Sequence, residues 1–238
     1  MLSQVGSGAV IRIAPSILAA DFGDLAGAVA KVSSEVDWLH VDVMDGHFVP
    51  NLTVGPPVVA SLRMHSDLYL DCHLMVSNPG DLLEAFRRSG ANGCSVHVEV
   101  GDTKELLVEA RRLGLRPGLA LNPDTPLEAV MPYLEMLDVL VVMTVVPGFG
   151  GQEFMPAPLE KVRLARTLAG ERGLSLDIEV DGGIDEENGI SSVLAGANVL
   201  VAGTAVFRAP SPVAAVRAMK DAALQAVHKP TVQAADQE

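Results

Sequence analysis

Short apolar runs rich in β-branched residues alternate with longer amphipathic runs from one end of the chain to the other. This alternation is typical of repeated β–α units around a parallel sheet. The pattern predicts eight strands, at residues 11–18, 38–44, 68–75, 93–98, 116–121, 138–145, 176–180 and 198–202. Between them, apolar positions at helical spacing predict helices at 24–35, 79–89, 103–113, 158–170 and 185–195.

Local signals mark several of the predicted helix ends. Pro79 and Pro126 fall near first turns, and Gly90, Gly114 and Gly196 follow last turns, where a left-handed residue is often required. Residues 229–238 are polar and without periodicity, so we expect a disordered tail there. The remaining residues, 1–228, leave no room for a second domain.

Eight such units can form either a closed barrel or a doubly wound open sheet. Polar residues follow the ends of many predicted strands, as in barrel enzymes whose sites are built from the loops after the strands. An open sheet would concentrate them at one switch point. We therefore predict an α/β fold, a single (β/α)₈ TIM barrel.

Composition and charge narrow the range of partners. Aromatic residues make up only 4% of the 238 residues, so the core must be mainly aliphatic. The formal net charge of −13 would repel nucleic acid and anionic membranes, and a phosphate would have to be bound by local dipoles. The two cysteines lie in apolar runs, and the start of the chain lacks a signal-peptide pattern. We therefore expect buried thiols, a cytoplasmic location, and neither nucleic acid nor membrane as a partner.

Strand parity brings polar side chains of three strands to one rim. Because side chains alternate between the two faces of a strand, His40 and Asp42 share the face opposite the aliphatic residues of 38–44. His73 takes the equivalent place in the third strand, and Asp181 lies at the end of the seventh. An inward His or carboxylate is costly unless it is paired or binds a metal.

Two imidazoles and two carboxylates suit zinc, iron, manganese or cobalt better than calcium or magnesium. Each residue alone would more often be a satisfied polar group of the core, but four on matching faces favour a metal site. Five neighbours, Asp71, Asp177, Glu179, His97 and Glu99, could orient ligands or simply belong to the barrel interior. The sequence leaves these two interpretations open.

Glycine-rich segments follow the last three strands. Gly182 and Gly183 follow the seventh strand, and Gly203 and Thr204 follow the eighth, where barrels often bind phosphate through backbone amides. Simple tight turns are the alternative. The segment 146–152, with its run of glycines, predicts either a mobile lid over a substrate or a flexible connector.

At several strand ends the sequence resembles the ribulose-phosphate 3-epimerase family. The matching segments are residues 13–21, 40–51 (HVDVMDGHFVPN), 72–76, 142–152 and 178–184 (IEVDGGI), and the likeness extends over nearly the whole chain except the tail. Two positions differ from the family's usual forms: Val146 replaces a residue that is often polar, and Thr204 replaces a usual serine. Neither difference removes a metal ligand.

The resemblance implies a function and a set of roles. The chain would epimerise carbon 3 of D-ribulose 5-phosphate to give D-xylulose 5-phosphate in the pentose phosphate pathway, through a metal-stabilised enediolate. His40, Asp42, His73 and Asp181 would bind one divalent ion per subunit, and Asp42 and Asp181 would be the acid and base. The implied substrate-binding residues are Ser16, His73, Gly148, Phe149, Gly150, Gly151, Asp181, Gly182, Gly183, Gly203 and Thr204.

The sequence also bears on the lining of the site, its metal and the assembly of the protein. Met44, Met75 and Met143 could line it with soft apolar surface or could be ordinary gap-fillers. Zinc or iron is the expected metal, with manganese or cobalt as alternatives, and we expect a phosphorylated ketose as substrate and a homo-oligomer as the assembly.

An epimerase for a hexulose phosphate such as allulose 6-phosphate is the nearest rival to this function. A related decarboxylase or aldolase needs a lysine where Met44 stands, and a non-catalytic phosphosugar-binding protein would not need the ligand set.

Overall fold

The protein is described here by a computed structural model, which covers residues 10–228. The predicted tail at 229–238 lies outside the described residues. Eight strands form a single parallel sheet in the order β1-β8-β7-β6-β5-β4-β3-β2. They are β1 (Arg12–Pro15), β2 (Trp38–Met44), β3 (Tyr69–Met75), β4 (Gly93–His97), β5 (Arg116–Leu121), β6 (Val139–Met143), β7 (Asp177–Asp181) and β8 (Val199–Ala202).

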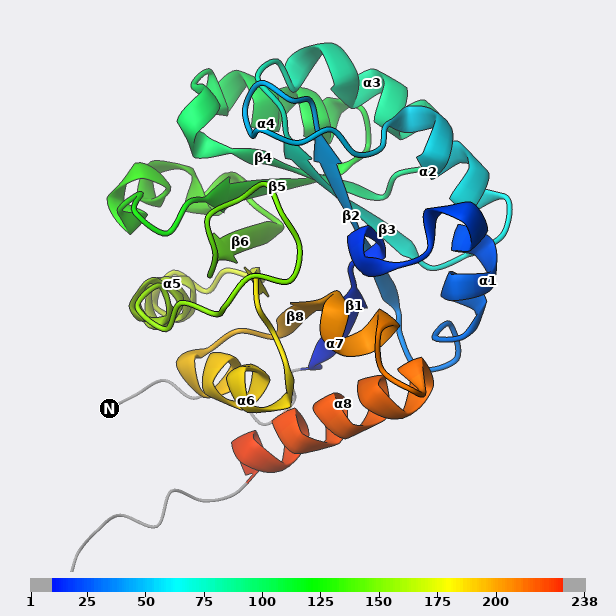
Figure 1. The fold of residues 1–238 in the computed structure, drawn as a ribbon. Coiled ribbons are helices and arrows are strands. Elements are labelled where there is room, and N and C mark those ends of the chain that lie inside the picture. Colours follow the sequence, from blue (N-terminus) through cyan, green and yellow to red (C-terminus); the bar gives the residue numbers. More distant parts are fainter. Residues whose placement is uncertain (1–9, 229–238) are drawn as a thin grey trace, which may run out of the picture.

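The helices lie outside the strands and follow one another around them (Figure 1). They are α1 (Leu25–Ala30), α2 (Pro56–Arg63), α3 (Gly80–Arg88), α4 (Thr103–Arg112), α5 (Leu159–Glu171), α6 (Glu186–Ala195), α7 (Thr204–Phe207) and α8 (Pro212–His228). A parallel bridge between Ser16 and His40 joins the two edge strands β1 and β2. The prediction of a (β/α)₈ barrel is therefore confirmed.

Two elements near the start of the chain are shorter than predicted. The first strand ends at Pro15 instead of residue 18, because Ser16 Oγ accepts a hydrogen bond from Leu18 N and opens a 3-10 turn. Helix α1 ends at Ala30 instead of residue 35. There the N–H groups of Val32 and Ser33 both donate to Val29 O, which tightens the last turn. Helices α2, α7 and α8 were not among the predicted helices.

The predicted helix ends are found where the glycines indicate. Gly90, Gly114 and Gly196 have φ values of 94°, 76° and 115°, in the left-handed region that glycine adopts without strain. The side chain of Asp185 caps α6 by accepting from Asn188 N at 2.8 Å. This cap fixes the start of the helix just after the end of β7.

The core has an outer and an inner part. Leu39, Val41 and Val43 of β2 face outward and belong to the large aliphatic cluster between strands and helices. Inside the barrel, Trp38 and Tyr69 stack at a centroid distance of 4.4 Å at the first residues of β2 and β3. Asp177 lies at this same end, the floor of the barrel, where it forms ion pairs with Arg12 at 3.1 Å and with Arg116 at 2.8 Å. Polar residues further along the strands therefore lie nearer to the opposite end of the barrel, which is its mouth.

Cys72 and Cys94 are buried, free thiols, as predicted. Among residues 10–228, no helix has both the length and the apolar character needed to cross a membrane.

Candidate active site

The structure brings His40, Asp42, His73 and Asp181 together at the mouth of the barrel. In the parallel register of β2 and β3, Asp42 pairs with His73, so these two side chains project side by side. Asp181 joins them from the last residue of β7. One ligand atom from each residue lies within 4.8 Å of all the others.

The distances within this cluster fit a small cation. His40 Nε2 lies 3.5 Å from Asp42 Oδ1 and 3.6 Å from Asp181 Oδ2, and His73 Nδ1 lies 3.8 Å and 3.3 Å from the same two oxygens. Ligands at about 2.0–2.2 Å from a tetrahedral zinc ion are about 3.3–3.6 Å apart. His40 Nε2 and His73 Nδ1 are buried and have no hydrogen-bond partner in the described part of the chain. A divalent ion would satisfy both nitrogens.

The charges of the cluster stabilise one another. Burial raises the pKa of Asp42, but the adjacent imidazoles of His40 and His73 outweigh it and hold that pKa below its ordinary value. Burial lowers the pKa of His73, but the neighbouring carboxylates of Asp181 and Asp42 outweigh this and raise it to about 9. Without a metal ion, His73 therefore carries a proton that a bound cation would displace.

Two carboxyl groups lie behind His40, on the floor side of the cluster. His40 Nδ1 is 3.1 Å from Asp71 Oδ2, with hydrogen-bond geometry, and 3.2 Å from Glu179 Oε1, without it. Both carboxyl side chains are fully buried, and burial together with the charge of Asp71 raises the pKa of Glu179 to about 8. Asp71 and Glu179 thus contact a predicted ligand, whereas Asp177 lies at the barrel floor.

His97 and Glu99 form a second arrangement behind His73. His73 Nε2 lies 2.8 Å from His97 Nε2, and His97 Nδ1 lies 3.0 Å from Glu99 Oε2. Burial lowers the pKa of His97 to about 4. Burial raises the pKa of Glu99, but hydrogen bonds from His97, Thr125 and Asn122 outweigh it and lower that pKa to about 2.

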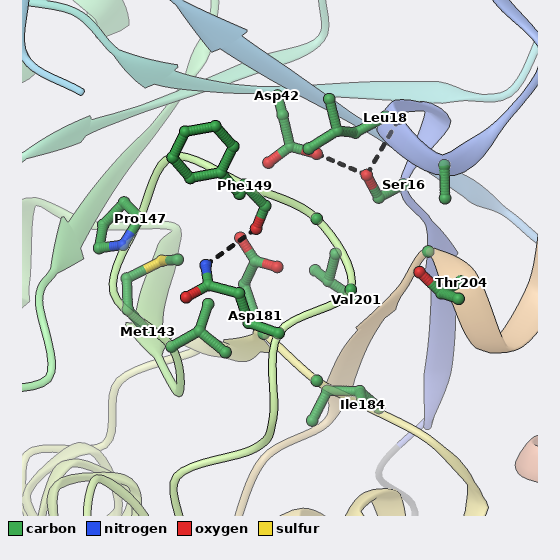
Figure 2. A pocket seen from close by; sticks show the side chains of 18 of the residues that line it. Ser16, Leu18, Asp42, Met143, Pro147, Phe149, Asp181, Ile184, Val201 and Thr204 are labelled. Atoms are coloured by element: carbon green, nitrogen blue, oxygen red, sulfur yellow. Dashed lines mark hydrogen bonds between the residues drawn. The ribbon is translucent and has the colours of Figure 1, made fainter. Parts of the chain in front are cut away.

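A cavity of about 340 Å³ opens above the cluster (Figure 2). Asp42 and Asp181 reach into it from different strands, and Ser16 Oγ donates a hydrogen bond of 2.5 Å to Asp42 Oδ2. The other predicted site residues that line the cavity are Met44, Met75, Met143, Gly148, Phe149, Gly150, Gly151, Gly182, Gly183, Gly203 and Thr204. His40 and His73 lie beneath this lining.

The glycines after β7 allow a close approach of two chain segments. Gly182 and Gly183 have φ values of 125° and 68°. A Cβ on Gly182 would lie 2.8 Å from Val145 N, and one on Gly183 would lie 2.7 Å from Phe154 N. Only glycine therefore permits this tight packing next to Asp181.

The segment 146–152 lies over one side of the cavity and is anchored by two side chains. Asn51 Nδ2 donates to Gly148 O at 2.8 Å, and Gln152 Nε2 donates to Val146 O and Phe149 O at 2.7 and 2.9 Å. The Phe149 side chain remains half exposed above the cavity. Neither Asn51 nor Gln152 was among the predicted site residues, although both lie in the motif segments 40–51 and 142–152, in the loops that follow β2 and β6.

Other lining residues were also not predicted. They are Leu18, Ala19, Val145, Pro147, Ile184, Asp185, Val201 and Ala205. Most are apolar, and their one shared sequence signal is a position at or just after the end of a predicted strand.

Comparison with known proteins places this geometry in a family context. A model described as the ribulose-phosphate 3 epimerase family matches residues 12–207. The cytoplasmic isoform of ribulose-phosphate 3-epimerase from Oryza sativa subsp. japonica is 46% identical over 222 residues, which are 91% of this chain and 96% of the relative. Ribulose-phosphate 3-epimerase from Mycobacterium tuberculosis (strain ATCC 25618 / H37Rv) is 46% identical over 209 residues, 87% of this chain and 91% of the relative.

A solved structure with much lower sequence identity shares the fold. The crystal structure of 3-hexulose-6-phosphate synthase from Salmonella typhimurium is 17% identical, with a TM-score of 0.65, covering 91% of this chain and 100% of that one. At this identity the likeness concerns the barrel alone.

Proposed function

The chain belongs to the ribulose-phosphate 3-epimerase family, and we propose that it inverts carbon 3 of D-ribulose 5-phosphate to give D-xylulose 5-phosphate. The observation that carries the proposal is the convergence of four ligand atoms within 4.8 Å of one another beneath a cavity that two carboxylates enter. The proposal treats residues 1–228 as one barrel domain with one such site.

Asp42 and Asp181 are the acid and base of the proposed reaction. Inverting a carbon next to a ketone requires that a proton leave one face of the carbon and that another be delivered to the opposite face. Asp42 comes from β2 and Asp181 from β7, and these strands are separated in the sheet by β1 and β8. Two carboxylates from different sides of the mouth can therefore serve the two faces of one bound carbon.

Each oxygen of Asp42 has a different environment. Oδ1 faces His40 and His73, whereas Oδ2 accepts the hydrogen bond of Ser16 in the cavity. This arrangement lets Asp42 contribute one oxygen to the cluster and keep the other for proton transfer. Ser16 orients the second oxygen, and its backbone bridge to His40 ties β1 to the same site.

His40, Asp42, His73 and Asp181 would hold one divalent ion, for which zinc or iron fits the two-nitrogen, two-oxygen set, with manganese or cobalt as alternatives. When bound, such an ion supplies a positive charge that stabilises the negative charge developing on the ketone oxygen as the proton leaves. Behind the ligands, Asp71 Oδ2 accepts a hydrogen bond from His40 Nδ1 and so orients this imidazole.

The remaining lining residues hold and enclose the substrate. Gly182, Gly183, Gly203 and Thr204 offer backbone amides for the phosphate on one side of the cavity. On the other side Phe149 and the glycines at 148, 150 and 151 cover the sugar, and Met44, Met75 and Met143 limit the access of water. We also propose that the protein forms a homo-oligomer and is located in the cytoplasm.

Turnover on two ketose phosphates tests the proposed substrate. We expect metal-loaded protein to convert D-ribulose 5-phosphate to D-xylulose 5-phosphate with a much higher kcat/KM than it shows on D-allulose 6-phosphate. Preference for the hexulose would contradict the substrate assignment, and inactivity on both would contradict the reaction.

A further inference from the structure

A row of hydrogen bonds leads from His73 away from the metal cluster to the loop after β5. His73 Nε2 meets His97 Nε2 at 2.8 Å, and His97 Nδ1 meets Glu99 Oε2 at 3.0 Å. The other oxygen of Glu99 accepts from Asn122 N at 2.8 Å and from Thr125 Oγ1 at 2.5 Å. The imidazoles of His73 and His97 are completely buried, so water cannot substitute for a missing partner.

The order of protons along this row follows from its two ends. At one end, one oxygen of Glu99 accepts from Asn122 N–H, a backbone group that can only donate. The second oxygen of the Glu99 carboxylate also accepts, and its donor is His97 Nδ1–H. A neutral His97 then presents a lone pair at Nε2, so His73 must donate from Nε2. In the neutral ring that binds a metal ion, His73 Nδ1 is then left with the lone pair, and this is the atom that faces the cluster.

We propose that His97 and Glu99 are positioning residues that fix His73 in the tautomer and orientation needed to bind a metal ion through Nδ1. The inference rests on the metal site of the proposed function, and it assigns roles to two residues that the sequence left open. Partners of this kind orient ligand imidazoles and make them more basic, and their loss typically weakens metal binding about 10- to 100-fold.

A lysine from α5 fixes the far end of the row. Lys161 Nζ donates to the carbonyl oxygens of Asn122, Pro123 and Thr125 at 3.0, 2.6 and 2.6 Å. These bonds hold the loop whose Asn122 N–H and Thr125 hydroxyl group donate to Glu99. The position of His73 thus depends on a continuous set of contacts from α5 through the loop after β5 to β4 and β3.

An amide in place of the Glu99 carboxylate would disturb the row without changing its shape. In Glu99→Gln, one of the two sites that now face donors must receive an NH₂ group instead of an oxygen. If the NH₂ faces His97, His97 must accept at Nδ1 and carry its proton at Nε2. That proton would then face His73 Nε2 and drive the His73 proton to Nδ1, where it competes with the metal.

The test measures the affinity of the metal-free protein for Co²⁺ by competition with a chelator, together with the visible absorption bands of the bound ion. We expect Glu99→Gln to raise the Kd about 10- to 100-fold and to change the cobalt bands. Glu35→Gln is the matched control, because the Glu35 side chain has the same 22% exposure as Glu99 and binds Arg217 at the other end of the barrel. Equal Kd values and spectra for Glu99→Gln, Glu35→Gln and the unchanged protein would overturn the proposal.

A second pair of variants tests the same step if Glu99→Gln does not fold. His97→Gln keeps an acceptor for His73 Nε2–H, whereas His97→Leu removes it. We expect the Kd of His97→Leu to exceed that of His97→Gln by about fivefold or more, and equal values would overturn the role of His97.

His73→Ala separates this inference from the proposed function. If the unchanged protein binds Co²⁺ no better than His73→Ala does, the metal site itself is refuted. If His73→Ala weakens binding and Glu99→Gln does not, the positioning role alone is refuted.

Discussion

Replacing Gly183 by alanine tests how closely the segment after β7 packs against the segment that covers the cavity. Gly183 has a φ of 68°, and an added Cβ would lie 2.7 Å from Phe154 N and 2.9 Å from Gln152 O. Gly173 is a matched control, because its φ is 64° and a Cβ there would have no neighbour within 4 Å in the described structure. The two variants share the same backbone strain and differ only in available space.

The expected magnitudes follow from these two contributions. The left-handed conformation costs an alanine about 1–2 kcal/mol at either position. At Gly183 the backbone of 152–154 must also shift, and forced overpacking typically costs a further 1–3 kcal/mol or so. We therefore expect Gly183→Ala to lower the free energy of unfolding by about 1–3 kcal/mol more than Gly173→Ala does.

Urea unfolding followed by tryptophan fluorescence measures this difference. Trp38 is the only tryptophan and lies at the barrel floor, stacked on Tyr69, so its emission reports global unfolding. We also expect Gly183→Ala, and not Gly173→Ala, to raise the KM for D-ribulose 5-phosphate. Equal losses of stability in the two variants would refute the argument that close backbone approach requires the glycine at position 183.

Two further predictions concern the charges of the site. His73 in the metal-free fold has a pKa of about 9, above its ordinary 6.5, so the stabilisation it provides is complete below about pH 6.5 and is lost as the pH rises through 9. Unfolding of metal-free protein should therefore require up to about 3 kcal/mol less at pH 9.5 than at pH 6, and a constant or rising value would contradict this. Ser16→Ala removes the 2.5 Å hydrogen bond to Asp42 Oδ2 and should lower kcat about 10- to 100-fold. Ser33→Ala, which loses an exposed bond to Ala30 O, is the control, and an unchanged kcat in Ser16→Ala would exclude a role for the hydroxyl.

Strand parity is the reason that the sequence predicts so much of this site. The two-residue period of a strand places His40 and Asp42 inward once Val41 is assigned to the outer core, and the parallel register then brings His73 beside Asp42. The same reasoning predicts that Asp181 reaches the mouth. These inferences need no knowledge of how loops or helices pack.

Contacts between loops have no comparable periodicity. The bonds from Asn122 and Thr125 to Glu99 join segments more than 20 residues apart, and nothing in the local pattern of either segment indicates them. The early end of β1 depends on one side-chain hydrogen bond and that of α1 on two backbone hydrogen bonds, which apolar periodicity does not encode. Helix α2 begins at Pro56 and Pro57, a pair that is equally typical of a loop.

Proton exchange with solvent during turnover tests the central claim most directly. In deuterated water, metal-loaded protein should form D-xylulose 5-phosphate that carries deuterium at carbon 3, because Asp42 and Asp181 exchange their protons with solvent. Asp42→Asn and Asp181→Asn should each lower net epimerisation at least about 100-fold while the Trp38 fluorescence of the folded barrel is kept. Product that retains its original hydrogen at carbon 3, or full turnover by either variant, would contradict epimerisation by two carboxylates.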